Sequence, residues 1–98
     1  MIDIDFSHNG GVVTFDGFPI KEETSLENYI DDLKEDMLQV EFPGDYILDV
    51  GWRPSFEIKG KFHIVLIKSF DWSKPIYSAT AESMIELKDK INKVLDIV

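Results

Sequence analysis

The stretch YILDVGW at residues 46–52, followed by KFHIVLIK at residues 61–68, decides the fold class of this chain. In the first stretch a large apolar residue stands at every second position, which is typical of a strand with one buried face. The second stretch is almost continuously apolar, as expected of a central strand that is covered on both faces. Both are predicted to be strands of one antiparallel sheet.

Two more strands are expected nearer the amino terminus. Apolar residues alternate with aspartates over residues 2–6, and Asn9-Gly10 follows shortly after. Asn-Gly is a strong hairpin signal, because a type I′ turn needs a positive φ at both central positions. Residues 12–15 are therefore expected to run back antiparallel to residues 2–6.

Two helices are expected as well. Thr24 and Glu27 have the spacing of a capping box, and the last helix is expected to begin near Thr80 as its N-cap. The apolar stripe of the first helix is formed by Leu26, Ile30, Leu33, Met37 and Val40. The resulting fold class is α+β, a single antiparallel sheet of about four strands with two helices in the order ββαββα. One domain is expected to span residues 1–98.

Composition narrows the class of protein. The chain has 98 residues, 44% of them hydrophobic, and no cysteine. The hydrophobic fraction is enough for one modest core. The absence of cysteine excludes disulfides and thiolate nucleophiles. The amino terminus lacks the pattern of a secretory signal, and no apolar run reaches the roughly 18 residues of a membrane span. A cytoplasmic location is therefore expected.

The net charge of −9 is concentrated in one half of the chain. Residues 1–50 hold thirteen acids against two lysines, a net charge of −11, whereas residues 51–98 have a net charge of +2. The negative electrostatic field of residues 1–50 repels nucleic acid and anionic membranes and accelerates encounter with a basic protein. A general role in solubility is the alternative explanation.

The expected partner-binding residues lie on the acidic face of the first predicted helix. They are Asp31, Asp32, Glu35 and Asp36. Each pair of like charges four residues apart destabilises a helix by a few tenths of a kcal/mol. The presence of these four acids is therefore not explained by helix stability. They are expected to meet a cationic partner, although a solvated helix face is the simpler alternative.

The two tryptophans have different expected roles. Trp52 continues the apolar alternation of its strand and is expected in the core. Trp72 lies in a turn that Pro75 ends. It either seals the edge of the core or anchors an interface, and it is the fifth expected partner-binding residue.

Motifs for catalysis are missing. No phosphate-binding glycine loop, catalytic triad or serine elbow is present, and no catalytic residue or cofactor is expected. Asp3, Asp5 and Asp16 are weak candidates for a divalent cation, and carboxylates that protect a sheet edge are the alternative. His63 is a candidate base, but a histidine at the rim of the core is the commoner situation.

The chain resembles the small immunity proteins of bacterial toxin systems, including contact-dependent inhibition and polymorphic toxins. The resemblance lies in size, acidity, absence of cysteine, the αβ sheet, and the segments Asp49-Val50-Gly51-Trp52, Asp71-Trp72 and Pro75. It implies a protein that binds a basic nuclease toxin and occludes its active site.

Three functions are therefore considered. The first is an immunity protein that neutralises a basic toxin, with a ribonuclease as the expected target. The second is a regulatory or adaptor domain that docks another basic protein. The third is a small enzyme or metal-binding protein that uses Asp3, Asp5, Asp16 and His63. Direct binding of nucleic acid, a membrane or a small-molecule substrate is not expected.

Overall fold

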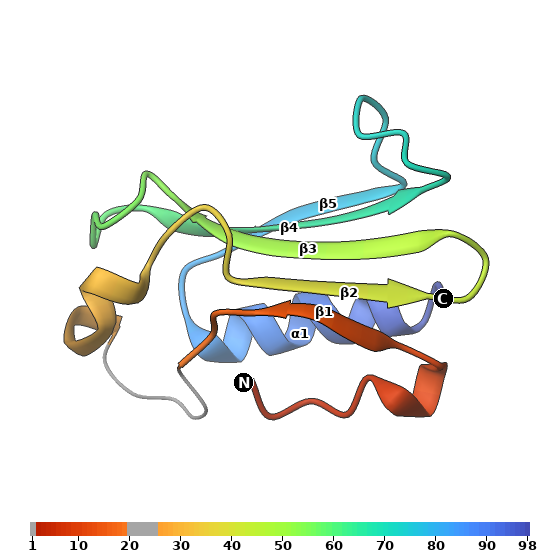
Figure 1. Ribbon diagram of the computed structural model, residues 1–98. Coiled ribbons are helices and arrows are strands. Elements are labelled where there is room, and N and C mark those ends of the chain that lie inside the picture. Colours follow the sequence, from red (N-terminus) through yellow and green to blue (C-terminus); the bar gives the residue numbers. More distant parts are fainter. Residues whose placement is uncertain (1, 20–25) are drawn as a thin grey trace.

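The structure is a computed structural model that describes residues 2–19 and 26–98 (Figure 1). The elements in chain order are the 3₁₀ helix η1 (Ser7–Asn9), β1 (Val12–Asp16), the 3₁₀ helix η2 (Leu26–Asp32), β2 (Leu38–Phe42), β3 (Tyr46–Arg53), β4 (Lys61–Lys68), β5 (Tyr77–Ala81) and α1 (Met84–Leu95).

All five strands form one antiparallel sheet in the order β1-β2-β3-β4-β5. β3 and β4 are paired along their whole length, from Tyr46 opposite Lys68 to Arg53 opposite Lys61. The predicted α+β class with a single antiparallel sheet is confirmed, as are the two central strands. The expected strand number of about four and the order ββαββα are wrong.

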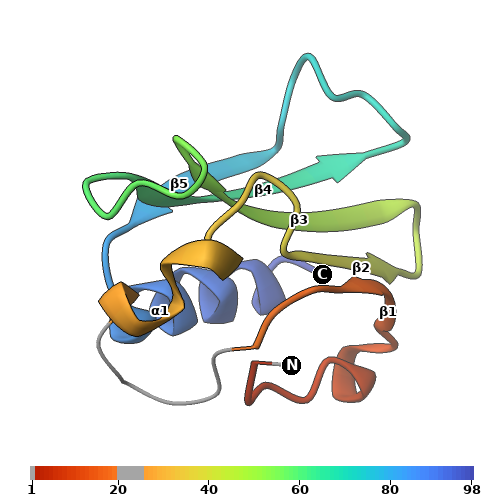
Figure 2. The same ribbon diagram turned by 60° about the vertical axis from the view of Figure 1, so that its left-hand side comes forward.

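The helix α1 covers one face of this sheet (Figures 1 and 2). It buries Met84, Leu87, Ile91 and Val94. These residues belong to the same buried cluster as Leu48, Val50 and Trp52 of β3. Trp52 is 1% exposed, so its predicted place in the core is confirmed.

The predicted amino-terminal hairpin is wrong. Residues 2–6 are not a strand, although Ile2 and Phe6 are buried as the alternation implied. The carbonyl oxygen of Phe6 accepts hydrogen bonds from the amides of Asn9 and Gly11, at 3.1 and 2.9 Å, and these bonds close a compact helical turn. β1 instead pairs with β2, which lies much further along the chain.

The predicted helix over residues 24–40 is also wrong. Its proposed cap Thr24 lies outside the described residues, and the later part of the segment is divided between η2 and β2. A non-helical φ of −122° at Tyr29 interrupts η2. β2 gains five paired residues with β3 across a three-residue loop in which Gly44 and Asp45 have positive φ. The ladder of backbone hydrogen bonds in this hairpin outweighs the weak helical preference of the segment.

The last helix begins three residues later than expected. Thr80 is paired with His63 in β5, and the N-cap is Ser83. The Ser83 hydroxyl accepts a hydrogen bond from the Glu86 amide at 3.2 Å, and the Glu86 carboxylate accepts one from the Glu82 amide at 3.1 Å. This exchange is a capping box displaced by one position. No helix in the described part of the chain is long and apolar enough to cross a membrane.

Candidate functional site

The candidate site is the face of the sheet that points away from α1, here called the open face. No helix or strand in residues 2–19 and 26–98 forms a second layer over it (Figures 1 and 2). The register of the strands fixes the side chains that it displays from the three central strands: Gln39 and Glu41 of β2, Ile47, Asp49 and Arg53 of β3, and Lys61, His63, Val65 and Ile67 of β4.

One end of the open face is apolar. Ile47 and Ile67 lie opposite each other on β3 and β4 and are buried, although they are on the side away from α1. The loop of residues 69–76 projects from this end of the sheet (Figure 1). Its exposed hydrophobic side chains are Phe70, Trp72 and Ile76. Grouped exposed apolar side chains of this kind are typical of interaction surfaces.

At the other end, the backbone that leads into β2 crosses over the sheet at Gly51. The amide of Trp52 donates to the carbonyl oxygen of Lys34 at 2.8 Å, and the amide of Met37 donates to that of Val50 at 3.1 Å. Between these two bonds the chain bulges over Gly51, where a Cβ atom would overlap the Glu35 carbonyl. The bulge therefore places Asp36 beside the open face.

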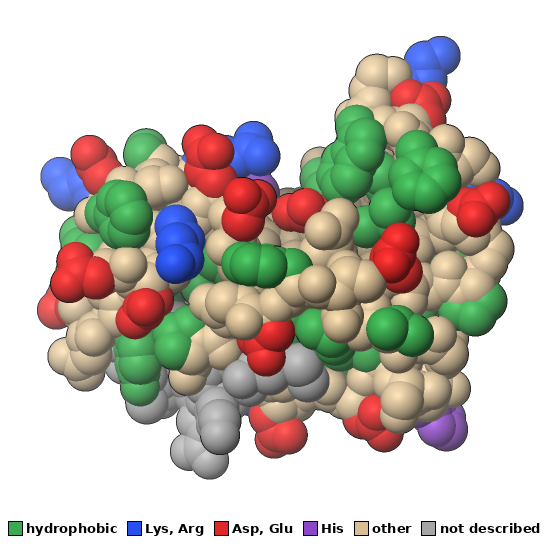
Figure 3. Space-filling model, in the orientation of Figure 1, with side chains coloured by type: hydrophobic (Ala, Val, Ile, Leu, Met, Phe, Trp, Pro, Cys, Tyr) green, Lys and Arg blue, Asp and Glu red, His purple; other side chains and the backbone are tan. Residues whose placement is uncertain are grey.

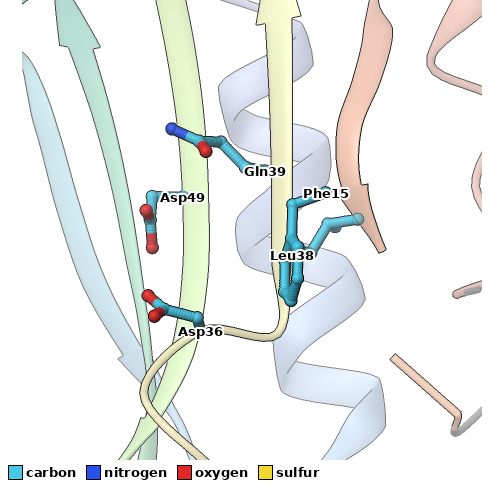
Figure 4. A pocket seen from close by; sticks show the side chains of 5 residues that line it. All are labelled: Phe15, Asp36, Leu38, Gln39 and Asp49. Atoms are coloured by element: carbon cyan, nitrogen blue, oxygen red, sulfur yellow. The ribbon is translucent and has the colours of Figure 1, made fainter. Parts of the chain in front are cut away.

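A hollow of about 260 Å³ lies between this bulge and β1. It is here called the acidic hollow and is lined by Phe15, Asp36, Leu38, Gln39 and Asp49. Figure 4 shows the carboxylates of Asp36 and Asp49 turned toward each other, with the Phe15 ring on the opposite side and the Gln39 amide at one end. The surface is visibly hollowed in the middle of this face, where carboxylates gather (Figure 3).

The carboxylate of Asp49 is held in an unfavourable environment. Burial raises its pKa above the ordinary value, and the nearby charge of Asp36 raises the pKa further, while Arg53 partly offsets both effects. In the described part of the chain no cationic group lies within 4.0 Å of either carboxylate. The acidic hollow thus holds two carboxylates that have no ion-pair partner among the described residues.

His63 does not supply the missing positive charge. It is partly buried in β4, and burial lowers its pKa, with Arg53 and Lys61 lowering the pKa further. The imidazole is therefore mainly neutral at pH 7 and adds little positive charge to the open face.

The five residues predicted to bind a partner do not form one surface. Glu35 and Asp36 are exposed on the bulge, whereas Asp31 and Asp32 belong to η2. Asp32 lines a separate hollow together with Phe18 and Lys34. The residues do not share an α-helical face, because the segment is not an α-helix. Trp72 is 49% exposed and lies on the loop at the apolar end.

Sequence reasoning missed three residues of the acidic hollow. Phe15 is 43% exposed on β1, and Gln39 and Asp49 point outward from β2 and β3. The signal for Asp49 was present, since it alternates with the buried residues of its strand. Gln39 and Phe15 were hidden by the wrong helix and by the wrong partner for β1.

Asp5 and Asp16, which were considered for a metal, do not line the acidic hollow. Asp5 accepts hydrogen bonds from the Ser7 amide at 3.0 Å and from the Ser7 hydroxyl at 2.5 Å, which stabilise the turn at η1. Asp16 accepts one from the Phe18 amide at 3.2 Å. Across residues 2–19 and 26–98 there is no group of three or more His, Asp or Glu side chains placed to hold a metal ion.

Comparison of the chain with protein-family models, with curated proteins and with solved structures found no match. The function is therefore argued from the open face itself.

Proposed function

We propose that this protein is an immunity protein that binds and neutralises a basic toxin domain, with a ribonuclease as the expected target, and that it binds through the open face. The proposal keeps the partner expected from the charge of the chain. It moves the interface from an acidic helix to the sheet, because the predicted helix does not exist.

The observation that carries the proposal is the pairing of unneutralised charge with exposed aromatic groups on one face. Asp36 and Asp49 lie together in the acidic hollow, which the exposed Phe15 also lines, and Trp72 is exposed on the loop of residues 69–76 that projects from the apolar end of the sheet (Figure 1). Aromatic side chains dominate the binding energy of many protein interfaces. Complementary charge accelerates association and excludes wrong partners. A basic protein surface satisfies both features.

Inhibition would require no catalytic group in this chain. A ribonuclease binds its substrate through cationic side chains that contact phosphates. Carboxylates at similar positions compete for the same cations, and charge-assisted hydrogen bonds of this type are strong. The bound domain would then block access of the nucleic acid to the active site.

The test begins with capture of the partner from the native host by the tagged protein, followed by mass spectrometry. The captured protein is then expressed in cells with and without this chain. We expect a basic protein that arrests growth alone and is harmless when co-expressed. The variant Asp36→Lys/Asp49→Lys should fail to protect the cells.

A harmless basic partner would contradict the immunity function and would favour the adaptor alternative. A partner that is not basic, or one that binds the double variant equally well, would contradict the proposed use of the open face.

A further inference from the structure

The acidic hollow has walls of two different kinds. On one side the Phe15 ring forms an apolar wall, and on the other side are the carboxylates of Asp36 and Asp49 (Figure 4). The side-chain amide of Gln39 lies at one end (Figure 4). The volume of the hollow, about 260 Å³, is many times that needed to hold one water molecule, so the end of a long side chain can enter.

These walls match a flat cation that carries several hydrogen-bond donors. A guanidinium group stacks on an aromatic ring and presents its donors in a planar fork that fits carboxylates. An ammonium group is a compact and strongly hydrated point charge, and it would leave the phenyl wall without a flat partner. A bound metal ion is a poor fit, since the described residues bring only two carboxylates to this place.

The position of the hollow also favours an anchoring role. It lies on the open face, between β1 and β3, and its carboxylate from Asp49 is already partly removed from water. A cation that enters therefore meets a carboxylate that folding has already partly desolvated. Anchor residues of interfaces commonly fill such preformed, shielded pockets.

We infer that the acidic hollow receives an arginine side chain of the partner, stacked against Phe15 and hydrogen-bonded to Asp36, Asp49 and the Gln39 side chain. This inference rests on the proposed function, which it refines by naming the group that the open face recognises.

The inference is tested without the partner. The ¹⁵N-labelled protein is titrated with Nα-acetyl-arginine amide and, in parallel, with Nα-acetyl-lysine amide, and amide chemical shifts are followed by NMR. We expect saturable shifts at Phe15, Gln39 and Asp49 with the arginine probe, and at least a threefold weaker response to the lysine probe.

Three variants test which side chains cause the response to the arginine probe. Asp49→Asn should weaken the arginine response about tenfold, whereas Asp89→Asn, which removes the same charge from the far side of the molecule on α1, should leave it unchanged. Phe15→Leu keeps an apolar wall but removes the ring, and it should abolish the preference for arginine over lysine.

Equal responses to the two probes, or responses that Asp49→Asn does not alter, would overturn the inference. If the arginine probe fails while the protein still binds and neutralises a basic toxin, the proposed function stands and the anchor must be sought elsewhere on the open face.

Discussion

The carbonyl group of Glu35 lies directly over Gly51, so the chain crosses the sheet where β3 has no side chain. Hydrogen bonds on both sides hold this crossing, from Trp52 to Lys34 and from Met37 to Val50. The glycine is therefore required for close approach of two backbones, and this approach sets Asp36 next to Asp49.

Replacement of Gly51 by alanine should destabilise the protein by about 1 to 3 kcal/mol, since the new methyl group overlaps a backbone carbonyl rather than a movable side chain. The bulge must shift to relieve the overlap. Urea denaturation monitored by tryptophan fluorescence measures the loss, with Ser78→Ala on the exposed part of β5 as the control. An unchanged free energy of unfolding would mean that the bulge is not fixed over Gly51.

Replacement of Asp49 by asparagine should stabilise the protein at pH 7. In the folded state the pKa of Asp49 is raised above 3.8, mainly by burial and then by Asp36. Between the unfolded and folded pKa values the folded state binds more protons than the unfolded state, so stability falls as pH rises through that window. Asparagine carries no charge and avoids this loss.

The advantage of Asp49→Asn should therefore be largest above the folded pKa and should shrink as the pH falls toward 3.8. Urea denaturation at a series of pH values tests this sign. Asp89→Asn on α1 is the matched control, because it removes an equal charge from an exposed ion pair with Lys93. An advantage that grows on acidification would be the wrong sign for a raised pKa.

Replacement of Ser83 by alanine should cost about 1 kcal/mol of stability. Its hydroxyl accepts the hydrogen bond from the Glu86 amide, which would otherwise be an unpaired donor in the first turn of α1. Thermal unfolding of Ser83→Ala measures the effect, and Thr80→Ala serves as the control because Thr80 lies in β5 rather than at the cap. Equal losses in the two variants would argue against the displaced capping box.

Replacement of the two tryptophans should have different effects, on stability for Trp52 and on partner binding for Trp72. Trp52 is 1% exposed and donates from its indole to the Glu57 carbonyl oxygen at 2.8 Å, so Trp52→Ala should cost about 3 to 5 kcal/mol. Trp72 is 49% exposed, and Trp72→Ala should change the free energy of unfolding by less than about 0.5 kcal/mol. The same Trp72 variant should nevertheless weaken partner binding about tenfold. A large loss of stability would instead assign Trp72 to the core.

Sequence patterns predicted the centre of the fold better than its margins. Residues 46–52 are strongly periodic and residues 61–68 are almost continuously apolar, and the strands β3 and β4 that contain them pair over eight residues. In both segments the sequence pattern predicts a strand, and the structure has a paired strand there. Residues 24–40 satisfy two patterns at once, since Leu33, Met37 and Val40 have helical spacing and yet reach the core from a loop and a strand.

The choice between these two patterns was decided by distant contacts. The turn at Pro43-Gly44-Asp45 lets β2 fold back on β3, and the hydrogen bonds gained there are not visible in a local helical stripe. The acidic hollow could not be predicted for the same reason, since it also depends on contacts between distant parts of the chain. Asp36 and Asp49 are thirteen residues apart in sequence, and only the bulge over Gly51 brings them to one hollow with Phe15.

The most direct test of the open face as the binding surface compares two double variants that remove equal charge. Asp36→Asn/Asp49→Asn neutralises the acidic hollow, and Asp31→Asn/Asp32→Asn neutralises two of the three acids of η2, leaving Glu27. The dissociation constant for the captured toxin domain is measured by calorimetry for both variants and for the unmodified protein. We expect at least a tenfold increase, about 1.4 kcal/mol, for the hollow variant and less than a threefold increase for the η2 variant. Equal effects, or a larger effect of the η2 variant, would contradict binding through the open face.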